Sequence, residues 1–265
     1  MDWIQAVVLA LVQGLTEILP ISSSGHLVLV PHFLGWPDQG LAYDVALHLG
    51  TLFAVAAYFR REVAGMAVSW AGSLAGRPLD EPARFAWRLL LASVPAALAG
   101  LLFNDAIEQH LRSPKVVAAT LIAYGVLLGL ADRYAPARRG DAETTWRDAL
   151  LIGLAQALAL VPGTSRSGVT MTAARLLGLT RTGAARFSFL MSIPIIALAG
   201  GYKFLQLALG EQPVDWGLIA IGMVVAFAST LVSIHVLLLI VQRFSFMPFV
   251  VYRLGLGAVL VYVFF

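Results

Sequence analysis

Cysteine is absent from this chain of 265 residues, and charged side chains are scarce. The absence of cysteine excludes disulfides, thiolate zinc sites and a thiol nucleophile. Asp, Glu, Lys and Arg make up only 12% of the residues, against about 25% in an ordinary soluble domain. The net charge of +3 is small and the basic residues form no single stripe, so we expect no nucleic-acid partner.

Apolar residues take the place of the missing charge. They make up 59% of the chain, and the mean hydropathy is +0.83. This composition excludes both a soluble globular domain and a disordered chain. It predicts an all-α integral membrane protein with a single membrane domain over residues 1–265.

Six stretches approach the length of about 20 apolar residues that a membrane-spanning helix needs. They lie at roughly 41–59, 86–103, 116–131, 187–207, 217–241 and 247–265. Two further apolar stretches, 1–33 and 149–179, are interrupted by proline, glycine and runs of hydroxyl residues. Because unpaired backbone groups are costly against lipid, we expect the six spans to enclose both interrupted stretches.

Arginines flanking the spans predict the orientation. They cluster in the expected loops at 60–88 and 133–147 and recur at Arg175, Arg181, Arg186 and Arg243, which we place in the cytoplasm. Loops 104–115 and 210–216 then lie outside, as do both termini. This arrangement requires each interrupted stretch to enter the membrane and return to the same side, the first from outside and the second from inside.

The two interrupted stretches resemble each other. QGLTEILPISSSG (13–25) aligns without gaps on QALALVPGTSRSG (156–168), with five identical residues in thirteen. Each half, about 1–148 and 149–265, reads as one re-entrant hairpin followed by three spans, and an odd number of spans inverts the second copy. Inverted repeats place a polar site near the middle of the membrane. We therefore expect the turns 22–26 and 163–170 to face each other.

The first turn combines a carboxylate, an amide, hydroxyls and a histidine. These groups belong to Gln13, Glu17, Ser22, Ser23, Ser24 and His26. Gln13 and Glu17 are four residues apart and share one helical face. A carboxylate in an apolar half-helix is expensive and marks a functional site by default, although Glu17 as a simple cap of the next turn stays open.

The second turn has the composition of an anion-binding loop at the start of a helix. Its candidate substrate-binding residues are Gly163, Thr164, Ser165, Ser167, Gly168 and Thr170. Arg166 adds a planar fork that matches two phosphate oxygens. The alternative to a phosphate-binding role is that Arg166 pairs with Glu17 for structural reasons alone. Together the two turns favour phosphoryl transfer on a lipid substrate.

At these motifs the sequence resembles the undecaprenyl pyrophosphate phosphatases of the bacitracin-resistance type. The match rests on QGLTEILPISSSGH (13–26) and PGTSRSGVT (162–170), and it continues through 187–190 and Tyr252-Arg253. The resemblance implies hydrolysis of undecaprenyl pyrophosphate to undecaprenyl phosphate and inorganic phosphate at the outer face of a bacterial cytoplasmic membrane. It also implies recycling of the carrier lipid for cell-wall synthesis, and bacitracin resistance.

Site residues and a cofactor also follow from the resemblance. The family's motif residues map onto Gln13, Glu17, Ser23, His26, Ser165, Arg166, Ser167 and Thr170. We expect Glu17, Ser23, His26 and Arg166 to be catalytic, and Gln13, Ser22, Ser24 and the second turn to bind substrate. The resemblance also implies stimulation by a divalent cation, Mg²⁺ or Ca²⁺, with Glu17 as the candidate ligand. Many relatives have a second glutamate where this chain has Gln13, which is a poorer ligand and no base. A homodimer is compatible with the sequence.

Several mechanisms and one other function stay open. Ser23 attacks phosphorus with Glu17 or His26 taking its proton, or His26 is the nucleophile, or a cation on Glu17 activates water. The other function is a transporter or flippase of isoprenoid phosphate lipids, because inverted repeats are also typical of transporters. Release of phosphate by protein in detergent distinguishes hydrolysis from transport.

Overall fold

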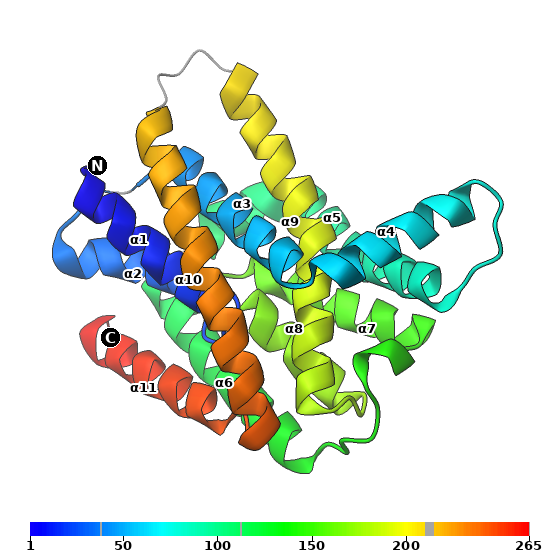
Figure 1. Ribbon diagram of the computed structural model, residues 1–265. Coiled ribbons are helices and arrows are strands. Elements are labelled where there is room, and N and C mark those ends of the chain that lie inside the picture. Colours follow the sequence, from blue (N-terminus) through cyan, green and yellow to red (C-terminus); the bar gives the residue numbers. More distant parts are fainter. Residues whose placement is uncertain (38, 112, 210–214, 265) are drawn as a thin grey trace.

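The computed structural model describes residues 1–265 except 38, 112, 210–214 and 265. Within the helices it describes the backbone but not the side chains of residues 28, 41, 104–106, 108–109 and 207–208. The described part is helical and contains no strand (Figure 1). Its α-helices are α1 Trp3–Thr16, α2 Ser23–Leu34, α3 Leu41–Tyr58, α4 Arg60–Leu74, α5 Glu81–His110, α6 Pro114–Tyr134, α7 Trp146–Ala157, α8 Arg166–Leu176, α9 Arg181–Leu209, α10 Trp216–Arg243 and α11 Met247–Phe264, with 3-10 turns η1 Asp141–Glu143 and η2 Leu158–Leu160.

The long apolar helices confirm an integral membrane protein. Within the described residues, α5, α6, α9, α10 and α11 are long and apolar enough to cross a bilayer, and α3 qualifies together with α4 as a bent pair. These six helices coincide with the six predicted spans. The predicted outer loop 210–216 lies mostly outside the described residues.

One segment differs from its expectation. We expected residues 60–88 to form a cytoplasmic loop, but residues 60–74 form helix α4, which turns 88° away from α3. The reason is an apolar stripe that the basic start of the segment conceals in the sequence. Val63, Met66 and Trp70 lie on it at helical spacing and line an apolar groove with residues of α5 and α9.

The two interrupted stretches form broken helices, α1–α2 and α7–α8, which lie on opposite sides of the bundle (Figure 1). α1 and α7 both begin with a capping box, formed by Asp2 with Gln5 and by Thr145 with Asp148. α1 packs on α10 and α7 packs on α5. Glycine permits both approaches: a Cβ on Gly14 would meet Ser229 Oγ at 1.9 Å, and one on Gly153 would meet the Ala92 carbonyl oxygen at 2.4 Å.

The turn inside each broken helix repeats the same unusual backbone. Ser22 and Ser165 precede α2 and α8 with φ of 77° and 71°, values that residues other than glycine rarely adopt. Each serine hydroxyl accepts from the backbone N–H three residues on, at Gly25 and Gly168. In both turns the hydroxyl also contacts the serine two residues later, at 3.3 Å for Ser24 and 3.2 Å for Ser167.

Hydroxyl groups of α10 satisfy the end of α1. Thr230 Oγ1 donates to the carbonyl oxygen of Gly14 at 3.2 Å, and Ser233 Oγ donates to that of Leu15 at 3.0 Å. The last carbonyls of a helix have no partner within the helix, so these bonds remove a cost that is high in an apolar interior. They fix the position at which Glu17 follows α1.

Candidate active site

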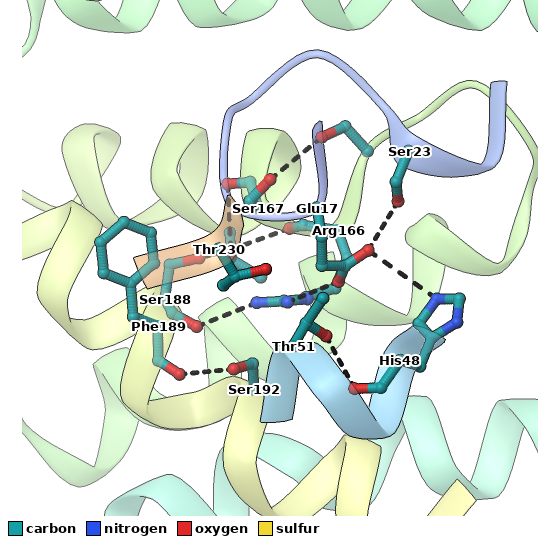
Figure 2. A network of polar contacts seen from close by, with 12 residues as sticks. Glu17, Ser23, His48, Thr51, Arg166, Ser167, Ser188, Phe189, Ser192 and Thr230 are labelled. Carbon is teal, nitrogen blue, oxygen red and sulfur yellow. Dashed lines mark hydrogen bonds and ion pairs between the residues drawn. The ribbon is translucent and has the colours of Figure 1, made fainter. Parts of the chain in front are cut away.

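The two turns meet in the interior of the bundle (Figure 2). Arg166 Nη2 lies 2.8 Å from Glu17 Oε1, and Ser167 Oγ donates to the carbonyl oxygen of Leu19 at 2.9 Å. The contact that the sequence predicted between the turns is therefore present, across 149 residues of chain. It combines a carboxylate from one hairpin with a guanidinium from the other.

Glu17 is the centre of this arrangement and is only 7% exposed. Its Oε1 accepts from Arg166, while its Oε2 accepts from Ser23 Oγ at 2.6 Å and from Gln13 Nε2 at 3.2 Å. His48 Nε2, from α3, lies 3.8 Å from the same Oε2. Sequence analysis assigned His48 to neither catalysis nor binding, because nothing in the α3 sequence indicates that it faces α1.

Helix α9 also holds the guanidinium of Arg166 in place. Arg166 Nη1 donates to the backbone carbonyl of Ser188 on α9 at 3.1 Å (Figure 2). The Ser188 hydroxyl lies 2.7 Å from Thr170 Oγ1, which also donates to the carbonyl of Arg166. Thr170, predicted to bind substrate, thus positions the first turn of α8. Sequence reasoning missed Ser188.

Arg253 of α11 ties both turns together and is fully buried. Its Nη1 donates to Pro20 of the first turn at 3.3 Å, and its Nη2 donates to Gly163 at 3.1 Å and Thr164 at 3.0 Å, all to backbone oxygens. Further bonds reach Thr120 and Leu121 of α6. The described ion pairs include no carboxylate for Arg253. Together with Arg166 it therefore gives the site more positive than negative charge, which suits a pyrophosphate.

The described hydrogen bonds of His26 go to partners other than Glu17. His26 Nδ1 lies 2.7 Å from the carbonyl oxygen of Ser22, and its Nε2 lies 2.6 Å from the hydroxyl of Tyr252 on α11. The carbonyl only accepts, so Nδ1 carries a proton and donates, and in the neutral ring Nε2 accepts from the phenol. The planes of the two rings are nearly parallel, with an interplanar angle of 11°. Both nitrogens of His26 are thus engaged, and Tyr252 is a partner that the sequence did not indicate.

The remaining predicted residues shape the turns. Ser22, Ser24, Ser165 and Gly168 make the cap contacts described above, and Gly163 presents its carbonyl to Arg253. Two buried polar atoms, Gln13 Oε1 and Thr164 Oγ1, find no hydrogen-bond partner among the described residues. Buried polar atoms are usually paired, so these two are available to a ligand that enters the site.

The residues around Glu17 do not fit a resident divalent cation. Mg²⁺ and Ca²⁺ take about six to eight oxygen ligands. Both oxygens of Glu17 already accept hydrogen bonds, one of them from a guanidinium, and Gln13 stands where a second carboxylate would be needed. The described residues contain no group of three His, Asp or Glu that could hold a metal. The positive charge beside this carboxylate comes from Arg166.

Comparison with known proteins agrees with the motifs. The family model described as bacitracin resistance protein BacA matches residues 6–259. The "Undecaprenyl-diphosphatase 2" of Stutzerimonas stutzeri is 56% identical, over 100% of this chain and 99% of its own length. The undecaprenyl-diphosphatases of Teredinibacter turnerae and Thioalkalivibrio sulfidiphilus are each 54% identical, over 98% and 100% of both chains respectively. The chain belongs to the BacA family of bacitracin resistance proteins.

Proposed function

We propose that this protein hydrolyses undecaprenyl pyrophosphate to undecaprenyl phosphate and inorganic phosphate, and thereby confers bacitracin resistance. The observation that carries the proposal is the contact of Ser23 and Arg166 with the two oxygens of one buried carboxylate, Glu17. A hydroxyl beside a base and a guanidinium are the groups that phosphoryl transfer requires. The names of the full-length relatives identify the same substrate.

Ser23 is the nucleophile of the proposed reaction. Its hydroxyl donates to Glu17 Oε2 at 2.6 Å, so a base is already in place to take the proton. His26 is the weaker candidate, because Nδ1 is bound to the Ser22 carbonyl and Nε2 to Tyr252. Ser23 Oγ attacks the terminal phosphorus, the lipid phosphate leaves, and water then hydrolyses the phosphoserine.

Arg166 and the start of α8 hold the pyrophosphate. The guanidinium fork is fixed by Glu17 and Ser188 and lies at a helix N-terminus, where partial positive charge favours anions. The buried cation Arg253 adds to the positive potential from behind the turns. Negative charge that develops on the transferring phosphoryl group is stabilised by groups that need not move.

The membrane arrangement is part of the proposal. The protein lies in the bacterial inner membrane with its active site open to the periplasmic face and both termini outside. Its halves, about 1–148 and 149–265, are inverted copies. The strained serine caps and the capping boxes support this, because both recur at a constant spacing of 143 residues, from Ser22 to Ser165 and from Asp2 to Thr145. A homodimer stays a prediction.

Phosphate release by the purified protein in detergent tests the activity. The wild-type protein should release inorganic phosphate from a polyprenyl pyrophosphate, and Glu17→Gln should be slower by at least about 10³-fold, because the base and the partner of Arg166 are lost together. A flippase would release none. Lack of phosphate release by folded wild-type protein, combined with lipid movement in sealed vesicles, would replace hydrolysis by transport.

A further inference from the structure

The imidazole of His48 takes part in none of the steps of the hydrolysis proposed above. It projects from α3 toward Glu17, and Nε2 lies 3.8 Å from Oε2, the same oxygen that accepts from Ser23 (Figure 2). The side chain of His48 is 37% exposed, whereas that of Glu17 is 7% exposed. His48 thus lies between the buried carboxylate and the exposed surface of the bundle.

The other nitrogen of His48 fixes where a proton can bind. Nδ1 lies 2.7 Å from the backbone carbonyl of Asp44, one turn earlier on α3. A carbonyl oxygen only accepts, so Nδ1 carries a hydrogen and Nε2 of the neutral ring has none. A bare nitrogen then faces the carboxylate oxygen. A proton that arrives on Oε2 is within reach of this nitrogen directly after a small movement, or through one water.

The other contacts of Glu17 offer no such acceptor. The amide nitrogen of Gln13 is a donor without basicity, and Arg166 keeps its own protons at all working pH values. A carboxylate that is paired with a guanidinium favours its charged form and returns a proton readily. Among the described groups that contact Glu17 Oε2, His48 is the one that accepts a proton near neutral pH.

We propose that His48 is the proton-transfer partner of Glu17, a positioning residue that removes the proton of Ser23 from the buried site. This rests on the proposed hydrolysis. In the first step Ser23 Oγ bonds to the terminal phosphorus, and the P–O bond to the lipid phosphate breaks with its electron pair. The serine proton passes to Glu17 Oε2 and on to His48 Nε2. In the second step water bonds to phosphorus, Ser23 Oγ leaves and recovers the held proton, and the proton lost by water is released to solvent.

Among the described residues, charged groups lie on α3 itself and on α1, α9 and α10, which pack against it. Those of α9 are Lys203 and two arginines, Arg181 and Arg186, that are paired with carboxylates elsewhere. Glu17 faces His48 from the end of α1, and Arg166 of α8 lies across that carboxylate. Asp44 is on the same helix, and its carboxylate accepts from Gln39 at 2.8 Å. On α10, which packs against α3, His235 contacts Tyr58, ten residues away from His48 along α3. Of these groups, Glu17 is the one whose carboxylate lies 3.8 Å from His48 Nε2.

The test compares His48→Gln with the wild-type protein and with His235→Gln, which makes the same chemical change outside the site. Phosphate release is measured between pH 5 and 8 in detergent. We expect His48→Gln to lower kcat by about 10²-fold with KM changed less than about 3-fold, as for other proton-transfer groups. The wild-type protein and His235→Gln should lose kcat together as the pH falls, because protonated His48 accepts nothing. His48→Gln should lack that loss.

A second variant separates proton transfer from structure. In His48→Ala, added imidazole should restore part of kcat, because the exposed edge of the site admits it. A lower kcat with a wild-type pH profile and no rescue would show that His48 only shapes the site and would overturn the inference, as would an unchanged kcat. If the wild-type protein itself releases no phosphate, the proposed hydrolysis fails, and this inference falls with it.

Discussion

The two serine turns have the same backbone and opposite chemistry. Both place a serine at positive φ before a half-helix, and both cap the N–H of a glycine three residues on. The residue after that serine differs: it is Ser23 in the first turn and Arg166 in the second. Each reaches one oxygen of Glu17, at 2.6 and 2.8 Å.

This difference shows how one scaffold supplies two halves of a reaction. The strained cap aims its following side chain into the bundle in both turns, so the position is set by the backbone and the chemistry by the residue placed there. In the first turn that residue is a hydroxyl, which attacks. In the second it is a guanidinium, which binds charge. Glu17 aligns with Leu160 of the other half and has no counterpart there.

Removing the hydroxyl should have the largest effect. Ser23→Ala should lower kcat by at least about 10⁴-fold, because the nucleophile is lost while the rest of the site persists. Phosphate release from a polyprenyl pyrophosphate measures it, and circular dichroism checks the fold. Ser69→Ala, which removes a serine hydroxyl of α4 outside the site, is the control. Full turnover by Ser23→Ala would mean that the first turn supplies no nucleophile.

Removing the guanidinium should come next. Arg166→Ala should lower kcat/KM by about 10³-fold, because charge on the transferring phosphoryl group is no longer stabilised. Arg166→Lys keeps the charge but loses the bidentate fork and should recover only part of the rate. Steady-state kinetics of the three proteins decide between these outcomes. Equal rates for Arg166→Ala and wild type would leave the second turn without a role in binding.

Arg253 donates to backbone carbonyls of both turns, so its loss should damage both. Arg253→Met should destabilise the protein by about 3 kcal/mol, because the carbonyls of Pro20, Gly163 and Thr164 lose their buried donor. Unfolding in a denaturing detergent measures this, and kcat should fall with it. A stable Arg253→Met protein with normal kcat would show that the turns hold each other without α11.

The caps formed by Ser22 and Ser165 should contribute equally to the stability of the protein. Ser22→Ala and Ser165→Ala each lose a cap bond while keeping the strained φ, so each should cost about 1 kcal/mol. Ser22→Gly and Ser165→Gly lose the same bond but relieve the strain, and should cost less than the alanine variants. Thermal unfolding of the four variants measures both differences. A large inequality between the two turns would break the structural equivalence.

The smallest effect concerns the start of the second hairpin. Burial raises the pKa of Asp148, but hydrogen bonds from Arg139 and Thr145 outweigh it and hold the pKa below its usual value. The pair therefore stabilises the protein above a pH of about 3.9, the usual aspartate pKa, and the contribution is lost as the pH falls below it.

At pH 7 Asp148→Asn should cost about 1 kcal/mol or less, as for a helix cap. Denaturant titrations of both proteins should give a constant difference between pH 5 and 8. A difference that changes across this range would contradict the assignment of the pair.

The sequence predicted the spans and the meeting of the turns because both depend on local signals. Apolar length defines the spans, and proline, glycine and serine runs define the breaks at 20–22 and 162–165. The turns were predicted to meet because inverted repeats place a polar site near the middle of the membrane, and an Arg166–Glu17 pair was the structural alternative. Helix α4 was missed, since its basic start hides the apolar stripe formed by Val63, Met66 and Trp70.

The contacts that α11 and α3 make with the two turns could not be predicted from the sequence. Tyr252 reaches His26 across 226 residues, and Arg253 reaches Pro20 across 233. Neither partner is marked by spacing, because α11 shows only two tyrosines and one arginine in an apolar span. His48 is hidden in the same way, since the rotation of α3 that turns it toward Glu17 follows from packing on α10 and α1.

Trapping the phosphorylated enzyme tests the central claim most directly. Wild-type protein is mixed with a polyprenyl pyrophosphate that is labelled in its terminal phosphate. The reaction is quenched within one turnover in denaturing detergent at mildly alkaline pH, where both phosphoserine and phosphohistidine survive, and the protein is digested and sequenced by mass spectrometry. The label should reside on Ser23 of the peptide that contains residues 22–26, and it should be absent from Ser23→Ala. Label on His26, or rapid turnover by wild-type protein without any labelled peptide, would contradict the account.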